Sequence, residues 1–170
     1  MRVLAPSPST GDDAPLRPSS EAVPHDLIEL LFFAYRDFVG DPDRILADYG
    51  FGRAHHRVLH FVQRRPGLTI AELLDILQIT KQSLNRVLKE LVEKGYIEQR
   101  TGRQDKRQRH LHTTASGREL ALRLVHLQAK RINRALDGIG PEAAPLVARY
   151  LAALIDPSEQ SKVQGLLGGR

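Results

Sequence analysis

The sequence contains no cysteine among its 170 residues. This absence excludes disulfides, thiolate metal sites, a cysteine nucleophile and thiol redox sensing. No apolar stretch is longer than the six residues from Leu30 to Tyr35, far short of the ~20 residues that span a bilayer. The N-terminus carries Arg2 but no apolar region that would make it a secretory signal. We therefore expect a cytoplasmic protein with no membrane partner.

The motifs of common enzyme classes are also missing from the chain. It has no Gly-x-Ser-x-Gly, no Walker lysine loop, no His-Glu-x-x-His and no Gly-x-Gly-x-x-Gly. Two histidine pairs, His56 with His60 and His110 with His112, have spacings that can bring imidazoles together. Neither pair has a nearby acid or cysteine to complete a ligand set. The sequence predicts a protein that is not an enzyme and holds no metal or cofactor.

What is present is a localised excess of positive charge. The whole chain carries a net charge of +5, and residues 81–112 contain nine Lys or Arg against four Asp or Glu. This segment therefore holds the entire excess, and the rest of the chain is neutral. A concentrated basic segment predicts a polyanionic partner such as nucleic acid.

The N-terminal part of the chain changes character at about residue 25. Residues 1–24 hold five of the ten prolines with several serines between them, a composition typical of a disordered tail. The helix that follows is apolar nearly all round, so we expect it to be enclosed in a core or in a subunit interface. Gly40 and Pro42 are expected to end it, and a second helix is predicted for Arg53 to Arg65. Residues 25–54 are thus assigned to a helical arm.

Residues 55–114 are predicted to form a helix-turn-helix followed by two strands. Thr69 and Glu72 have capping-box spacing, and Thr80 is a good N-cap for a helix that Gly95 should end. In that second helix the apolar residues follow an i, i+3, i+4, i+7 pattern, and the other face is polar and basic. Two short helices joined by a tight turn, the second with such a face, match the helix-turn-helix plan.

The strands and the C-terminal helices complete the prediction. Residues 96–100 and 107–113 are expected to pair as antiparallel strands, pinned by Ile97 and Leu111, with the basic stretch between them as an exposed tip. Thr114 should cap a long helix to about residue 137. A last helix over residues 141–155 is expected to point its apolar side chains inward. These are Leu146, Val147, Tyr150, Leu151 and Leu154. Residues 156–170 are predicted to be a frayed, flexible tail.

Several stretches of the chain resemble the MarR family of winged helix-turn-helix regulators. They are "HHRVLHFV", "LTIAELLDILQITKQSLNRVLKELVEKGYIEQ" and "DKRQRHLHTTASGREL". The last is similar to the family's wing signature, with Asp105, Arg107 and Thr114 in place, although Thr113 stands where the family usually has leucine. The resemblance covers roughly residues 27–155.

The resemblance implies a mainly α (α+β) fold, a winged helix-turn-helix with long N- and C-terminal helices that form a dimerisation region. It implies a homodimer that binds palindromic operators in double-stranded DNA, usually as a repressor. Some members release DNA when a small anionic ligand enters a cleft, and His55 and His56 resemble positions near that cleft. Asp105 is expected by resemblance to orient a wing arginine, either Arg107 or Arg103. The N-terminal helix and residues 115–155 would form the dimer interface, with Leu27, Leu30, Leu31, Phe32, Leu151 and Leu154.

The candidate DNA-contacting residues lie on the second helix and on the wing. Amides and guanidinium groups suit base edges in the major groove, whereas lysines suit phosphates. The predicted set is Thr80, Lys81, Gln82, Ser83, Asn85, Arg86, Lys89, Arg100, Arg103, Lys106, Arg107 and Arg109. The alternative is a winged-helix module that docks a protein and does not bind DNA specifically. An apolar or acidic second helix would favour that alternative, and the basic residues argue against it.

Overall fold

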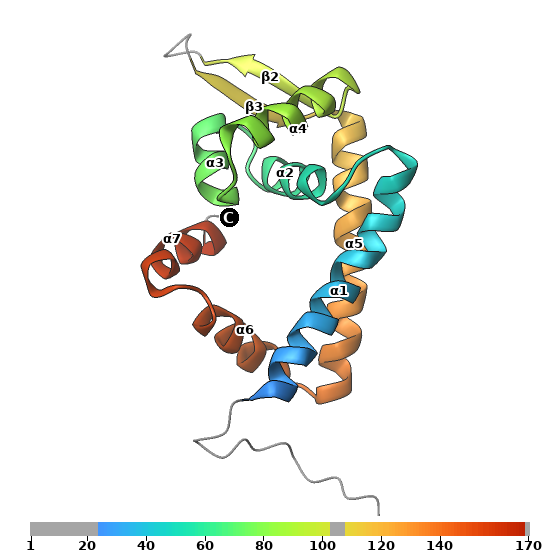
Figure 1. Cartoon of the computed structure of the whole chain (residues 1–170), viewed down its shortest axis with the longest axis vertical. Coiled ribbons are helices and arrows are strands. Elements are labelled where there is room, and N and C mark those ends of the chain that lie inside the picture. Colours follow the sequence, from blue (N-terminus) through green and yellow to red (C-terminus); the bar gives the residue numbers. More distant parts are fainter. Residues whose placement is uncertain (1–23, 103–107, 169–170) are drawn as a thin grey trace, which may run out of the picture. The chain divides into compact units, whose positions relative to one another are not determined.

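The computed structural model describes residues 24–102 and 108–168 and divides into two compact units, one up to Tyr35 and one from Arg36 onward. Figure 1 shows the elements in chain order. They are α1 (His25–Asp48), α2 (Arg53–Arg64), β1 (Leu68–Thr69), α3 (Ile70–Leu77), α4 (Lys81–Glu93), β2 (Ile97–Thr101), β3 (Arg109–Thr113), α5 (Ala115–Ile139), α6 (Ala143–Ala153) and α7 (Pro157–Gly168). In the described ranges, no helix is both long and apolar enough to cross a membrane.

Helix α1 continues beyond the end that the sequence predicted. The prediction that Gly40 and Pro42 stop this helix is wrong, because α1 reaches Asp48 with Pro42 inside it. A proline within a helix removes one backbone hydrogen bond and costs about 3 kcal/mol. Here Val39, Pro42 and Leu46 are all buried along one side of the helix. Burial of this apolar face offsets the missing bond.

The core of the second unit lies where α2 packs against α3, α4 and α5. Each of these helices contributes the apolar face that its sequence period predicts. The side chains with least exposure in this core are Leu46, Val58, Leu59, Val62, Leu73, Leu84, Leu91, Ile97, Leu111 and Leu124. Leu84, Val87, Leu88 and Leu91 of α4 are buried in this core, so the opposite face of α4 is left to solvent.

Threonine side chains begin the helices of the helix-turn-helix as predicted. The Thr69 hydroxyl accepts a hydrogen bond from the Glu72 amide at 3.2 Å, and the Glu72 carboxylate accepts one from the Thr69 amide at 2.7 Å. The Thr80 hydroxyl accepts from the Ser83 amide at 3.2 Å. Side-chain caps of this kind satisfy backbone N–H groups that have no partner within the helix. Both predicted helix starts are confirmed.

Two residues in the left-handed conformation end these same helices. Gln78 follows α3 with φ of 51°, and its side-chain amide donates to the Asp75 carbonyl at 2.6 Å. Gly95 follows the α4 C-cap with φ of 75°, which confirms its predicted place just past the helix end. The tight turn between α3 and α4 is thus fixed by a non-glycine residue in the left-handed conformation.

The wing is a three-stranded antiparallel sheet with the order β1-β3-β2. Ile97 and Leu111 are buried, as predicted, and hold β2 and β3 against the helices. The sequence missed β1, in which Leu68 pairs with Leu111. A strand of two residues carries no periodicity, so only its pairing reveals it. The other predicted strand ends differ slightly, since β2 begins at Ile97 and β3 at Arg109.

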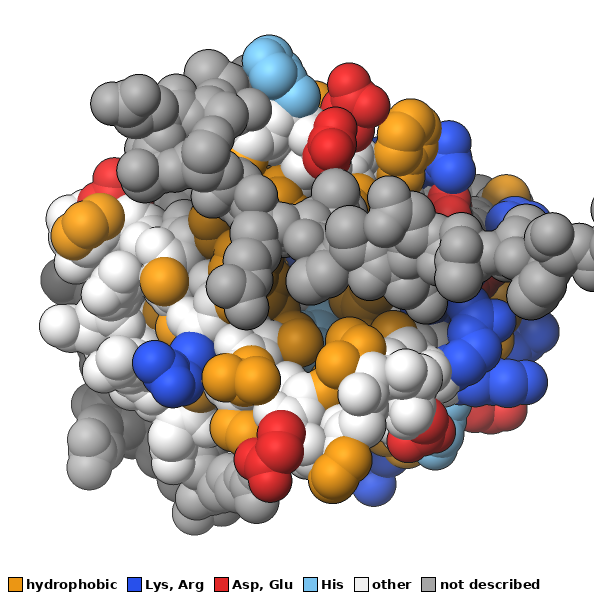
Figure 2. Space-filling view, turned by 90° about the horizontal axis from the view of Figure 1, so that it is seen from below, with side chains coloured by type: hydrophobic (Ala, Val, Ile, Leu, Met, Phe, Trp, Pro, Cys, Tyr) orange, Lys and Arg blue, Asp and Glu red, His pale blue; other side chains and the backbone are white. Residues whose placement is uncertain are grey.

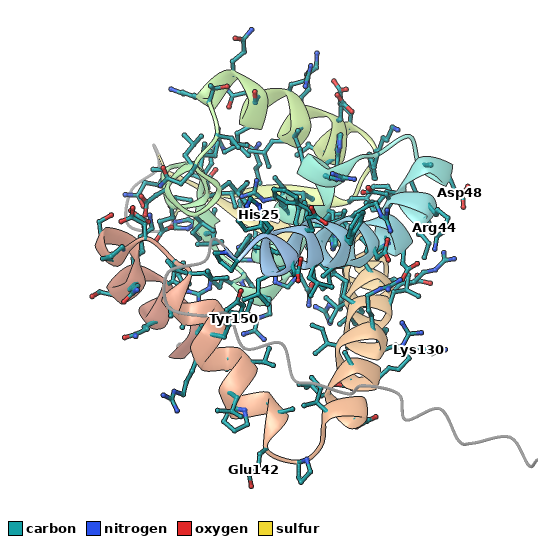
Figure 3. The ribbon with its side chains drawn as sticks, turned by 60° about the horizontal axis from the view of Figure 1, so that its bottom comes forward. His25, Arg44, Asp48, Lys130, Glu142 and Tyr150 are labelled. Atoms are coloured by element: carbon teal, nitrogen blue, oxygen red, sulfur yellow. The ribbon has the colours of Figure 1, made fainter. Side chains whose placement is uncertain are left out.

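The last two helices also depart from the prediction. Four of the five α6 side chains expected to face inward do not do so in the single chain, and the fifth, Val147, is only partly buried. Leu146, Tyr150, Leu151 and Leu154 are about half exposed, whereas Ala143 is buried. Hydrophobic side chains lie open on the surface in the view of Figure 2, and Tyr150 is labelled in Figure 3. This face of α6 has too few neighbours in one chain to be covered.

Residues 157–168 form helix α7, although the sequence predicted a frayed end. The Asp156 carboxylate caps this helix by accepting from the Ser158 amide at 2.9 Å. Lys162 then donates to the Asp75 carboxylate at 2.8 Å and to Glu159 at 2.9 Å. The glycines near the end suggested fraying, but the cap and the contact with α3 give the helix an anchor within the fold.

A close approach at the start of α5 gives a stability prediction. The Thr114 hydroxyl accepts from the Gly117 amide at 3.1 Å, and a Cβ at Gly117 would lie 1.9 Å from the Tyr96 carbonyl oxygen. Gly117→Ala should therefore force a backbone shift and lower the free energy of unfolding by about 1–3 kcal/mol, as overpacking does. Chemical denaturation monitored by circular dichroism would measure the loss.

Gly138 in the same helix provides the matched control. A Cβ there would meet nothing within 4 Å. Gly138→Ala should be neutral or stabilise the helix by about 0.5–1 kcal/mol, because alanine has the higher helix propensity. If Gly117→Ala is as stable as Gly138→Ala, the close approach of the Tyr96 carbonyl oxygen does not require a glycine at position 117.

Candidate nucleic-acid interface

The polar face of α4 is the most prominent candidate site. Gln82, Asn85 and Arg86 have i, i+3 and i+4 spacing and are all exposed, while Leu84 and Leu88 on the other side are buried. Because the buried side chains fix the rotation of α4, the amide and guanidinium groups are presented outward together. These are the groups that can make paired hydrogen bonds to base edges.

Thr80, Lys81 and Ser83 lie at the N-terminus of α4. Lys81 is exposed, whereas Thr80 and Ser83 are committed to the helix cap, with the Thr80 hydroxyl donating to the Ser83 hydroxyl at 2.9 Å. The N-terminal end of a helix carries partial positive charge and unpaired N–H groups. An exposed lysine beside that end creates a local environment that favours a phosphate.

Further along α4 the charges are mixed. Lys89 approaches Glu93 at only 3.7 Å, with side chains 74% and 62% exposed, so this ion pair is weak and leaves the ammonium group accessible. Glu90 is turned away toward His55 of α2, at 2.9 Å. The exposed charge of α4 is therefore positive on its first two turns and mixed further along the helix.

The described part of the wing contributes two arginines. Arg100 donates to Glu98 at 3.0 Å, and Arg109 donates to Thr101 at 2.7 Å. The Gly102 amide donates to the Gln108 carbonyl at 3.0 Å, just before the tip. The predicted tip residues lie outside the described residues, so their roles remain predictions. They are Arg103, Asp105, Lys106 and Arg107.

Sequence reasoning missed Arg118 at the start of α5. It lines a shallow, open depression together with Arg100, Glu98 and Thr114. The depression lies between the base of the wing and the first turn of α5. Arg118 lies within the stretch that resembles the family's wing signature but was not among the predicted contact residues, and the pairing of β2 with β3 brings Arg100 to the same side as β3 and the start of α5.

The two adjacent histidines of α2 have separate environments. His55 forms hydrogen bonds on both sides of its ring. The Gly52 amide donates to Nδ1 at 3.1 Å, and Nε2 lies 2.9 Å from the Glu90 carboxylate. His56 is buried. Burial lowers the pKa of His56 below its ordinary value of 6.5, the charge of His60 lowers it further, and Asp43 opposes the shift. Among the residues that the structure describes, no three His, Asp or Glu side chains lie close enough to hold a metal.

The lowered pKa of His56 predicts a loss of stability in acid. The unfolded chain binds a proton at His56 near pH 6.5, whereas the folded chain resists it, so stability is full above that pH and falls as pH drops below it. His56→Leu should reduce the loss between pH 7.5 and 5.5 by on the order of 1 kcal/mol. Urea unfolding at both pH values would test this, and an unchanged loss in the variant would contradict it.

Sequence reasoning also missed an aromatic group beside α4. Phe51 stacks on His55 with ring centroids 4.7 Å apart and meets Tyr96 edge-on at 5.1 Å. The Lys94 ammonium lies 4.6 Å from the centre of the Phe51 ring and donates to the Tyr49 carbonyl at 2.7 Å. These aromatics sit in a loop and at a strand start, where no periodic pattern marks them.

The sequence of the chain is similar to that of known transcriptional regulators. A family model described as MarR family matches residues 49–108, which contain the helix-turn-helix and part of the wing. The HTH-type transcriptional regulator PetP of Rhodobacter capsulatus is 48% identical over 139 residues. The match covers 82% of this chain and 84% of that protein.

Solved structures with low sequence identity share the fold. FabT of Streptococcus pneumoniae in complex with DNA has a TM-score of 0.69 at 21% identity, covering 76% of this chain and 93% of that chain. A mutant MarR from E. coli complexed with operator DNA has a TM-score of 0.59 at 21% identity, covering 78% and 94%. The shared winged helix-turn-helix and the close similarity to PetP show that the chain belongs to the MarR family of transcriptional regulators.

Proposed function

We propose that the protein is a homodimeric regulator that binds palindromic operators in double-stranded DNA and represses transcription. The observation that carries this proposal is the exposed face of α4, where Gln82, Asn85 and Arg86 stand together beside Lys81. Side chains of these types make base and phosphate contacts when such a helix enters the major groove. The similar structures of FabT in complex with DNA and of a mutant MarR complexed with operator DNA support the same proposal.

The proposed dimer rests on apolar surface that one chain leaves open. In α1, Leu27, Leu30, Leu31 and Phe32 are each at least 40% exposed. In α6, Leu151 and Leu154 are about half exposed. Contiguous apolar patches of this kind usually mark an interface. A second copy would cover both helices by burying like surfaces against each other.

An effector remains a prediction that follows from the family. His55 and His56 are the residues proposed to lie near its cleft, yet His55 is bound by Glu90 and Gly52, and His56 is buried. A ligand that binds the folded dimer but not the unfolded chain should raise its melting temperature, and the rise should grow with the logarithm of ligand concentration above Kd. Thermal shift with a panel of small aromatic acids is the direct test of this expectation.

The decisive experiment for the function is the selection of genomic fragments by the purified full-length protein, followed by sequencing. The enriched fragments should share an inverted repeat with half-site centres ~10–10.5 base pairs apart, or a multiple of that spacing. Reporter expression from such a fragment should fall when the protein is present. Absence of any shared sequence would favour the alternative, a winged-helix module that docks a protein.

A further inference from the structure

The contact between His55 of α2 and Glu90 of α4 uses both nitrogens of the imidazole. The Gly52 amide donates to Nδ1 at 3.1 Å, so Nδ1 carries no proton and the ring proton is on Nε2. Nε2 lies 2.9 Å from the Glu90 carboxylate and therefore donates to it. The same ring thus completes the N-terminal cap of α2 and reaches across to α4.

The ring is held in this orientation from other sides. Its side chain is only 12% exposed, and Phe51 stacks on it with an interplanar angle of 19°. Phe51 is itself covered by Lys94, which donates to the Tyr49 carbonyl. Glu90 and Lys94 are four residues apart on α4 and its C-cap. The α1–α2 loop and α2 therefore hold the C-terminal end of α4 through two contacts one turn apart, one at Glu90 and one at Lys94.

These two contacts hold the same helix that presents the candidate base-reading residues. Arg86 precedes Glu90 by four residues, and Gln82 precedes Arg86 by four, so all three lie along one line of the helix. Because a helix rotates as a rigid body, a roll of α4 that moved Glu90 from His55 would displace Arg86 and Gln82 as well. Base-specific contacts tolerate displacements of only ~0.5 Å and 10–20°.

We infer that His55 is a positioning residue for DNA recognition, which acts through Glu90 to set the roll of α4. Buried leucines set which face of α4 is turned outward, but apolar contacts are not directional and leave small changes in roll open. The hydrogen bond to Glu90 restricts this remaining freedom. It also turns the Glu90 carboxylate toward α2 and away from the surface that would meet phosphates. This inference rests on the proposed function, because its readout is the choice between DNA sequences.

The experiment uses Glu90, which is 39% exposed and can be changed with little risk to folding. Glu90→Ala removes the acceptor, whereas Glu90→Gln keeps an oxygen that can accept from Nε2 without the charge. Glu93→Ala is the matched control, since it removes the same charge three residues further along α4 from an exposed site. A selection from randomised operators, with thermal unfolding of each variant, measures sequence preference and stability separately.

Glu90→Ala should lose on the order of tenfold in its preference for the best operator over a mismatched one, as expected for one base contact displaced. Glu90→Gln and Glu93→Ala should keep the wild-type preference, and binding to random DNA should not weaken in any variant. A double variant, His55→Gln with Glu90→Ala, should be no less selective than Glu90→Ala alone.

Three outcomes would overturn the inference. If Glu90→Ala keeps its preference and loses only stability, the contact is purely structural. If Glu90→Ala, Glu90→Gln and Glu93→Ala all bind every sequence more tightly, Glu90 acts through its charge on DNA. If the wild-type protein itself shows no preference, the proposed function fails and the inference falls with it.

Discussion

Arg86→Glu should lower the affinity for the operator by more than about 100-fold. Loss of a base-specific contact costs roughly 1–3 kcal/mol, and a carboxylate placed against the phosphates adds repulsion. Arg86 is exposed and glutamate has a similar helix propensity, so the variant should fold normally. Fluorescence anisotropy with an operator duplex, at one fixed salt concentration, measures the change.

Lys130→Glu is the matched control for this charge reversal. Lys130 is exposed on α5, ~22 Å along the helix axis from its first residue at 1.5 Å per residue, and it is labelled in Figure 3. It should retain operator affinity within about threefold, because its charge is screened over such a distance. Equal losses in both variants would mean that net charge, and not the α4 face, governs binding.

Arg86→Ala and Lys89→Ala distinguish residues that recognise bases from residues that contact only phosphates. Arg86→Ala should relax the choice of base at symmetric positions of the operator. Lys89→Ala should weaken all sequences alike, and it should flatten the slope of log affinity against log salt by about one unit if it removes one phosphate contact. An Arg86→Ala variant with an unchanged sequence preference would move base readout to the wing or to DNA shape.

Leu31→Asp should abolish the dimer and lower operator affinity by more than about 100-fold. Leu31 is 43% exposed within a run of apolar side chains on α1, and a carboxylate there could not be buried against a second copy. A monomer binds only one half-site and loses the gain from linked binding, which is typically 10²–10⁴-fold. Sedimentation velocity at micromolar concentration would show the change in mass.

Leu122→Asp on α5 tests whether any exposed leucine would give the same result. Leu122 is also 43% exposed, but it is not one of the α1 and α6 side chains on which the proposed dimer rests. This variant should remain dimeric and bind the operator. A wild-type protein that sediments as a folded monomer would refute the dimer outright.

The sequence by itself determined the local structure of the helix-turn-helix. Thr69, Thr80 and Gly95 mark helix ends through bonds and backbone angles that involve only neighbouring residues, so their positions could be predicted. The burial of Leu84 and Leu88 follows from helical spacing alone. The outward face of α4, and with it the candidate DNA-contacting surface, follows for the same reason.

Only the tertiary structure decided the features that depend on partners distant in the chain. Pro42 stays inside α1 because its face is buried, and α7 forms where Lys162 reaches Asp75. The pairing of Leu68 with Leu111 creates a strand too short to show a period. The bond between His55 and Glu90 spans 35 positions and needs both helices in place. Such contacts depend on packing geometry, which local propensity and spacing do not contain.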